Sequence, residues 1–240
     1  TVTGQKLYVL GSVNGSGTIE GATGGDSGTL FVNYVDGKAE AGHVNVKTGE
    51  TAVEPGKAAK NSVADVDTLI DAIALGYNNI TVSSALSMDK DVVIPEGTEV
   101  SASKTITVAA GKILENNGKI TFTGTAGEIT LAGITTDEKT KVVTSGAILR
   151  NNGTIGVGES ATYALSVKAG ATVINDGTMY IFERKATGGS AVPTNILGYF
   201  ENNGTLNVKG DFTIGDGEKE LEFQNNGKMW VVAGATITVS

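Results

Sequence analysis

The 240-residue sequence predicts an all-β fold: a solenoid whose short parallel strands coil repeatedly about one axis. Two observations predict it. One turn recurs in the second half of the chain, formed by an apolar residue, a variable residue and then Asn-Asn-Gly or Asn-Asp-Gly. The positions two and four residues after each turn glycine are apolar, which is the period of two of a strand with one buried face. The turn glycines lie 35, 24, 27 and 23 residues apart and are Gly118, Gly153, Gly177, Gly204 and Gly227.

Residues 1–60 contain no copy of this pattern and predict a β-rich N-terminal appendage. Residues 6–10 form a short apolar strand candidate, and residues 11–28 are dominated by Gly, Ser and Thr, as in flexible segments. Residues 30–35 and those from Lys38 onward predict a hairpin with a type I′ turn at Asp36-Gly37. A further turn is expected at residues 47–49.

Residues 61–240 form the second predicted domain, which opens with a helix over residues 62–76. Ser62 is a suitable N-cap, Asp65 follows three residues later, and apolar side chains fall at 63, 66, 69, 70 and 73. Gly76 can end the helix. The first coil then begins with the strands at residues 80–82 and 92–94.

One coil is predicted to contain a strand, an Ala-Gly turn, a short strand, the Asn-Asn-Gly turn, a strand and a longer connection. Glycine and asparagine suit the corners because they tolerate positive φ. Polar stretches at residues 135–141 and 183–190 predict loops inserted into the longer coils. Independent hairpins with Asn-Gly turns are the alternative, but two different turns in a constant order favour the coil. The second turn lies at Gly111, Gly146 and Gly170, with further copies at residues 95–97 and 233–234.

The first asparagine of each turn is expected to stack in a column, with side-chain amides bonded from one coil to the next. The column comprises Asn116, Asn151, Asn175, Asn202 and Asn225. Four asparagines also match the glycosylation pattern Asn-x-Ser/Thr; these are Asn14, Asn79, Asn152 and Asn203. At the last two of these, turn chemistry already accounts for the residue.

This arrangement resembles the right-handed parallel β-helix of the pectin-lyase-like superfamily, and most of all non-enzymatic stretches of microbial surface proteins, adhesins and S-layer-like proteins. The resemblance covers residues 62–240 and rests on the repeated turn and on the segment at residues 62–76. It implies right-handed winding and a helix that caps the N-terminal end of the coil. The repeat is specific for architecture and says little about activity.

The composition narrows the class of protein. The net charge of −8 argues against a nucleic-acid partner, and no apolar stretch approaches the roughly 20 residues that cross a bilayer. There is no cysteine. The chain begins at Thr1 and is rich in Gly, Thr and Asn, with 5% aromatic residues. We therefore expect a secreted protein, either extracellular or bound to the cell surface.

Candidates for chemistry are few, and we expect no enzyme. The one histidine, His43, lies in an alternating strand, and the Gly-Asp-Ser-Gly motif around Ser27 precedes it, so no catalytic triad is supported. Arg150 occupies the variable position of the turn pattern and is expected at the surface. Arg184 falls in a predicted insertion. We expect no cofactor, and calcium is the weaker alternative. Its candidate ligands are Asp89 and Asp91, and separately Asp211, Asp216, Glu218 and Glu220.

The final residues, 233–240, predict a terminal coil without a cap, and solenoids normally protect such an edge. Copies of the chain are the expected partners, associating head to tail as a filament or surface layer through a donated N-terminal strand. A tolerated edge or a fragment is the alternative. The expected interface residues are Leu7, Tyr8, Val9, Leu10, Ile237 and Val239.

Tyr180 and Trp230 fall three residues after their turn glycines, in an outward-facing position of the strand. Exposed aromatic side chains on one sheet can stack on sugar rings or contact a partner subunit. The rival function is therefore an adhesive or carbohydrate-binding module that recognises surface polysaccharide. A loop or the appendage covering both rings is the alternative. A degraded polysaccharide lyase is a third reading.

Overall fold

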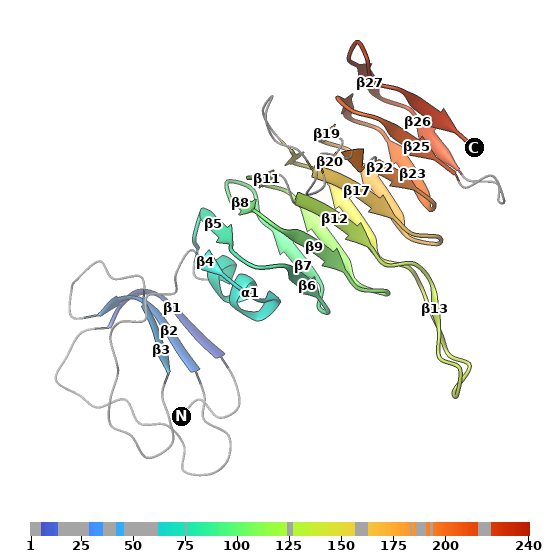
Figure 1. The fold of residues 1–240 in the computed structure, drawn as a ribbon. Coiled ribbons are helices and arrows are strands. Elements are labelled where there is room, and N and C mark those ends of the chain that lie inside the picture. Colours follow the sequence, from blue (N-terminus) through green and yellow to red (C-terminus); the bar gives the residue numbers. More distant parts are fainter. Residues whose placement is uncertain are drawn as a thin grey trace. The chain divides into compact units, whose positions relative to one another are not determined.

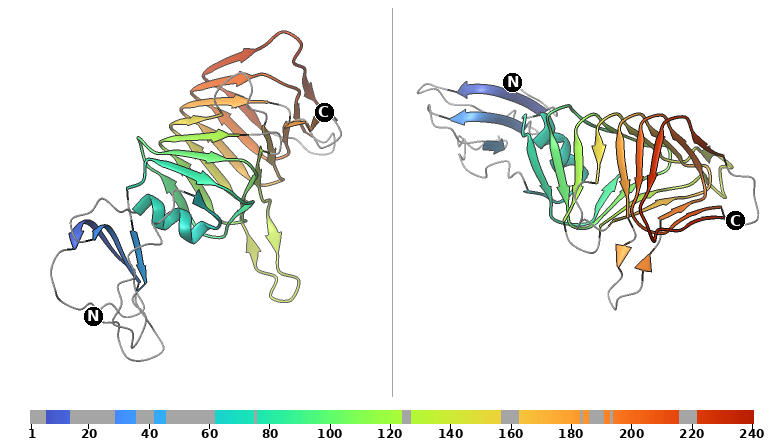
Figure 2. Two further views of the ribbon diagram at one scale, coloured as in Figure 1. Left: turned by 60° about the vertical axis from the view of Figure 1, so that its left-hand side comes forward. Right: turned by 90° about the horizontal axis from the view of Figure 1, so that it is seen from above.

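A computed structural model describes residues 6–13, 29–35, 42–45, 62–74, 76–123, 127–156, 163–182, 184–185, 191–192, 194–215 and 222–240. The chain divides into two units. One comprises residues 1–62 and 67–77, and the other comprises residues 63–66 and 78–240. The second unit is a β-solenoid of about six turns, which confirms the predicted coil and excludes independent hairpins as its basis (Figures 1 and 2).

Three parallel sheets form the solenoid, and each complete coil contributes one strand to each sheet. The eight-stranded sheet contains β4 (Ser62–Val63), β5 (Asn79–Val82), β8 (Glu99–Ala102), β11 (Lys119–Phe122), β16 (Thr154–Ile155), β19 (Thr178–Ile181), β24 (Thr205–Val208) and β27 (Lys228–Val231). The seven-stranded sheet contains β6 (Leu86–Met88), β9 (Thr105–Val108), β12 (Gly127–Leu131), β17 (Tyr163–Val167), β22 (Thr194–Ile196), β25 (Phe212–Ile214) and β28 (Ile237–Val239).

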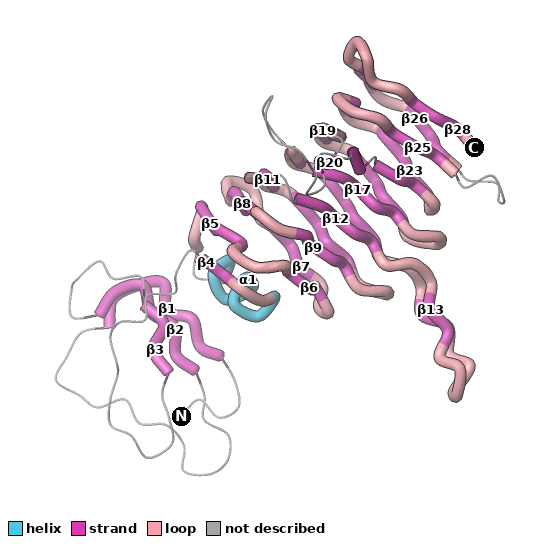
Figure 3. Tube along the Cα trace, in the orientation of Figure 1, coloured by secondary structure: helices cyan, strands magenta, loops and turns pink. Residues whose placement is uncertain are grey.

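The third sheet has six strands and holds the first asparagine of each turn, so we call it the asparagine sheet. Its strands are β7 (Val92–Ile94), β10 (Ile113–Asn116), β15 (Ile148–Asn151), β18 (Thr172–Asn175), β23 (Tyr199–Asn202) and β26 (Phe223–Asn225). Figure 3 shows how short these strands are and how regularly turns separate them. The predicted order of strands and turns is confirmed, and β6 is a strand that the sequence reading missed.

The interior of the solenoid is apolar because every second side chain of each strand points inward. The residues two positions after the turn glycines are buried in coil after coil, as predicted. Leu114, Leu149, Val173 and Phe200 form a further buried column in the asparagine sheet. A layer of stacked aromatic rings joins Phe122 to Tyr163, with ring centroids 4.6 Å apart.

The asparagine column is the main polar element of this interior. From Asn116 to Asn202, each amide nitrogen donates to the amide oxygen of the asparagine in the next coil, at 2.6–2.7 Å. The same nitrogen also donates to a backbone carbonyl in the strand that follows that asparagine, at 3.1–3.2 Å. The members from Asn116 to Asn202 are fully buried. Satisfied buried amides of this kind fix one register, since a slip of one residue would leave them unpaired. The predicted column is confirmed, and we call it the inner column.

A second amide column lies beside it and runs the other way. It consists of the second residue of each turn: Asn117, Asn152, Asp176, Asn203 and Asn226. Here the nitrogen of the later coil donates to the oxygen of the earlier coil, as from Asn152 to Asn117 at 2.7 Å. Asp176 accepts from Asn203 at 2.9 Å but has no donor to offer Asn152. This outer column is therefore interrupted at one place.

The turn glycines are explained by close packing of the coils. None of the five has positive φ. A Cβ at Gly177 would instead overlap the carbonyl oxygen of Gly153, and the same holds at the other coils. Positive φ is found at Gly111 and Gly170, with φ of 73° and 78°. The expectation that corner glycines provide positive φ is therefore confirmed for Gly111 and Gly170 and wrong for the five turn glycines. A local turn pattern does not show the contact between coils that requires glycine at those five positions.

Two of the expected second-turn copies were misplaced. Gly97, with φ of 80°, lies between β7 and β8, at the corner that the Asn-Asn-Gly turn occupies in later coils. Gly234 lies between β27 and β28, which is a different corner again. Gly146 occupies the predicted corner but does not have positive φ. Glycine is needed there for another reason, because a Cβ would overlap the backbone of Gly170.

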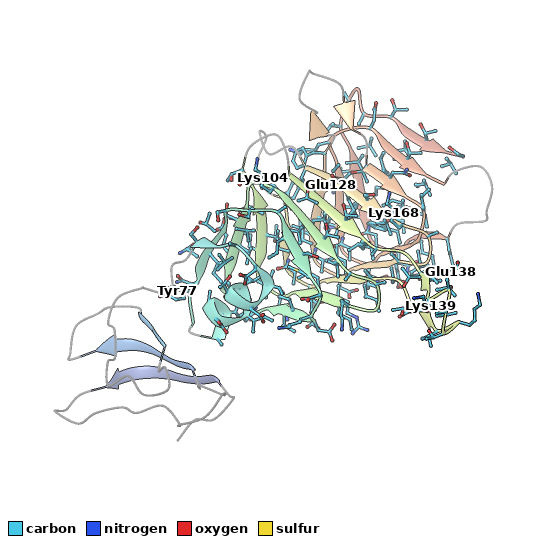
Figure 4. The ribbon with its side chains drawn as sticks, turned by 60° about the horizontal axis from the view of Figure 1, so that its bottom comes forward. Tyr77, Lys104, Glu128, Glu138, Lys139 and Lys168 are labelled. Carbon is cyan, nitrogen blue, oxygen red and sulfur yellow. The ribbon has the colours of Figure 1, made fainter. Side chains whose placement is uncertain are left out.

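The two predicted insertions are antiparallel strand pairs. β13 (Thr135–Thr136) pairs with β14 (Val143–Thr144), and β20 (Arg184–Lys185) pairs with β21 (Ala191–Val192). Glu138 and Lys139 mark the tip of the first, which projects from the coils (Figure 4). Asp137 accepts hydrogen bonds from the backbone N–H groups of Thr140 and Lys139, both at 2.8 Å, and these bonds hold its pKa below the ordinary aspartate value.

The helix α1 (Val66–Ala74) is shorter than predicted. Ser62 belongs to strand β4, so it is not the cap, and Asp65 occupies the position before the first helical residue. The predicted end at Gly76 is confirmed: its φ is 79°, its N–H donates to Ile73 at 2.9 Å, and the next N–H donates to Ala72. Coverage of the first coil by this helix stays a prediction.

The N-terminal unit contains a three-stranded sheet of β1 (Lys6–Val13), β2 (Thr29–Val35) and β3 (Gly42–Asn45). β1 and β2 are parallel, while β2 and β3 are antiparallel. The register places Phe31 opposite His43. The type I′ turn expected at Asp36-Gly37 and the turn expected at residues 47–49 both lie outside the described residues.

Candidate functional site

The last coil differs from all earlier ones in its exposure. Val208 is fully buried, but Val231, its partner in the next strand, is 46% exposed. Ile214 is 7% exposed, and its partner Val239 is 76% exposed. The inward-facing side chains of this coil therefore lack a layer above them within the described chain. Ile237, the other predicted interface residue of this strand, is half-buried.

The backbone and amides of the same coil are also open. In the described chain, β26, β27 and β28 each pair with one strand, on the side of the preceding coil. Asn225 accepts from Asn202, and no described residue accepts from its own amide nitrogen. In the outer column, Asn226 donates to Asn203 at 3.0 Å, and no described residue donates to its oxygen. The last coil therefore presents the amide nitrogen of Asn225 as a donor in the inner column and the amide oxygen of Asn226 as an acceptor in the outer column.

The opposite end of the inner column is closed differently. In β7, the strand of the preceding coil, Ile94 occupies the position that pairs with Asn116. The amide oxygen of Asn116 is therefore buried without a hydrogen-bond partner among the described residues. An unpaired buried acceptor costs about 1–3 kcal/mol. The column is therefore directional: it starts at an apolar residue and finishes at an open amide.

The predicted N-terminal interface residues lie in β1. Leu7, Tyr8 and Val9 pair in parallel with Leu30, Phe31 and Val32 of β2. β1 is an edge strand, because β2 is its one partner in the three-stranded sheet. Leu10 lies in the same strand, beside an irregularity in the register. The strand is formed, and within the described residues one of its edges pairs with no strand.

Tyr180 and Trp230 lie on the outward face of the eight-stranded sheet, as the spacing predicted. Trp230 is 63% exposed and Tyr180 is half-buried. Asn207 lies between them in register. The ammonium group of Lys209 lies over the Tyr180 ring, 5.7 Å from its centroid, and the sequence reading missed this contact because it arises between coils.

Two of the carboxylates proposed as calcium ligands have structural partners. Asp91 accepts the backbone N–H of Ile113 at 2.9 Å, and Asp211 accepts that of Thr236 at 3.0 Å. Each thus bonds the coil that follows it. Asp89 is exposed. Asp216, Glu218 and Glu220 lie outside the described residues. Across the ranges that the structure describes, no group of three or more metal-ligating side chains converges.

The other chemical candidates that the structure describes lie on different elements. Arg150 is exposed in β15, between Glu115 and Ile174. His43 lies in β3 and Arg184 in β20, while Ser27 and Asn14 fall outside the described residues. Asn79 is exposed, and Asn152 and Asn203 belong to the outer column. Burial raises the pKa of Tyr163, whose hydroxyl has no partner in the described chain.

Comparison with known proteins identifies no relative of this chain. No protein-family model, curated protein or solved structure matches the chain. No described helix is both long enough and apolar enough to span a membrane.

Proposed function

We propose that this chain is a non-enzymatic structural subunit of an extracellular filament or surface layer, which associates head to tail. The observation that carries the proposal is the contrast between the last two coils. Residues that are buried in one coil are exposed in the next, on a surface where three strand edges lie open together. Such an edge normally needs cover, and a strand or coil of a second copy provides it.

The open edge accepts a particular kind of partner. An added strand would pair with β26, β27 or β28 in parallel, as all strands of the solenoid do. Where it meets Asn225, it must offer an acceptor for the free amide. The edge strand β1 is the donor that we propose, since Leu7 and Val9 on one face could cover Ile237 and Val239. A contact between different surfaces of two copies propagates as a filament when it does not close.

The finer features of the fold belong to the same proposal. We infer right-handed winding, because crossover connections between parallel strands of one sheet are right-handed in nearly all proteins. The resemblance to pectin-lyase-like surface proteins, the secreted location and the capping role of α1 are proposed with it. The composition supports the secreted location, because the chain is rich in Gly, Thr and Asn with 5% aromatic residues.

Negative-stain microscopy and light scattering of the purified chain test this function. We expect filaments or oligomers, and we expect Val239→Lys to abolish them by placing a charge in the contact. Val93→Lys is the matched control, because Val93 is 51% exposed on the outer face of the first coil. Deleting residues 1–13 should also prevent assembly. Undiminished assembly of that deletion would refute strand donation, and a monomer at every concentration would refute self-association.

A further inference from the structure

A second surface carries a function independent of assembly. It is the outward face of β19, β24 and β27, which we call the aromatic face. Its six outward side chains form two columns across the three strands, in strict register. One column is Thr178, Thr205 and Lys228, and the other is Tyr180, Asn207 and Trp230. Two rings on one flat sheet are thus separated by one amide.

The spacing of the rings follows from the fold. Adjacent strands of a sheet lie about 4.8 Å apart, so side chains two strands apart are about 9.6 Å apart along the axis. That distance is close to the disaccharide repeat of an extended β-1,4-linked glycan, in which alternate sugars present the same face. Sugar rings stack on aromatic faces through their C–H groups. Trp230, which is 63% exposed, can therefore hold one sugar on its ring. Tyr180 is half-buried, stacks with Phe182 and has the Lys209 ammonium over its ring, so it contacts the sugar two positions along together with Lys209, and the Asn207 amide lies beside the sugar between them.

The charge of this face is opposite to that of the chain. The protein carries a net charge of −8, but none of the six side chains is acidic. Lys228 is exposed beside Trp230. Lys209, one residue beyond β24, places its ammonium over the Tyr180 ring. Among the described residues of β19, β24 and β27, no carboxylate accompanies these two lysines, which favours an anionic ligand over a neutral one.

We propose that the aromatic face binds an extended β-1,4-linked glycan that carries carboxylate groups. The chain of sugars lies parallel to the solenoid axis, with one ring stacked on Trp230 and the ring two positions along against Tyr180 and Lys209. Asn207 bonds the hydroxyl groups of the sugar between them, and Lys209 and Lys228 face the carboxylates. This function goes beyond assembly, because the face lies on the side of a sheet and leaves the strand edges free.

The test measures binding to carboxymethyl cellulose and to cellohexaose, which share the linkage and differ in charge. Affinity electrophoresis and calorimetry on the full chain should show binding to the first at low salt and weaker binding to the second. Trp230→Ala and Tyr180→Ala should each reduce affinity roughly tenfold. Lys228→Gln should weaken binding to the acidic polymer alone, and added salt should do the same.

Tyr199→Ala is the control, because Tyr199 lies on the outward face of the asparagine sheet, where its hydroxyl donates to Glu201 at 2.9 Å. Circular dichroism checks that each variant is folded. Unchanged binding by Trp230→Ala, equal losses in Tyr199→Ala, or no binding to either glycan would overturn the proposal. If Trp230→Ala prevented assembly while the wild-type chain bound no glycan, the face would be a subunit contact instead.

Discussion

Replacing Asn175 with alanine should destabilise the solenoid strongly, because this residue lies in the middle of the inner column. Its amide accepts from Asn151 at 2.7 Å and donates to Asn202 at 2.6 Å and to the carbonyl of Thr205 at 3.2 Å. All three bonds are lost, and buried partners are left unpaired. At about 1–2 kcal/mol for each bond, the free energy of unfolding should fall by about 3–6 kcal/mol.

Two variants in the same chain separate this effect from a general loss of asparagine. Asn225→Ala removes the terminal amide, which accepts one bond from Asn202, and should cost about 1 kcal/mol. Asn203→Ala removes bonds of the exposed outer column, where water can replace the partner, and should cost no more than about 1 kcal/mol.

Urea unfolding followed by circular dichroism measures these free energies, and Trp230 fluorescence shows whether the last coil unfolds with the rest. Coincident transitions are needed, because repeat arrays can unfold in stages. Hydrogen exchange of peptides from each coil then locates the loss. If Asn175→Ala and Asn203→Ala destabilise the protein equally, the inner column does not hold the coils in register and the reasoning is refuted.

Further predictions concern single positions. Gly177→Ala should lower the free energy of unfolding by more than about 3 kcal/mol, since its Cβ would overlap the backbone of Gly153, whereas Gly97→Ala, with open space around it, should cost about 1–2 kcal/mol from its positive φ. Thermal unfolding distinguishes them, and equal losses would contradict the packing argument. Asp176→Asn should raise the melting temperature slightly by completing the outer column; a lower value would show that the interruption is favourable. The pKa of Asp137 lies below its ordinary value, so the order that its bonds give the hairpin tip is present above about pH 4 and is lost as pH falls through the folded pKa. NMR of the Lys139 and Thr140 amides should report this loss, and an ordinary pKa would refute it.

The solenoid could be predicted from the sequence because its signals are local and repeated. An Asn-Asn-Gly turn followed by alternating apolar residues is legible in any one coil, and recurrence excluded chance. The column from Asn116 to Asn225 followed from stacking those coils. β6 was missed because Leu86 and Met88 flank one polar residue without any turn signal.

What the sequence could not reveal depends on contacts between coils. The turn glycines are needed because Gly177 approaches Gly153, which lies 24 residues earlier, and a turn pattern holds no record of this approach. Lys209 was missed for the same reason, since its ammonium meets a ring from the coil before it.

The opposite directions of the two amide columns make this protein extensible by copying. A duplicated gene segment of one coil would bring an acceptor for Asn225 and a donor for Asn226 together, in the spacing that the existing turns already use. Growth before β7 has no such advantage, because Ile94 offers neither group. The two columns therefore favour lengthening at the end that carries Asn225 and Asn226.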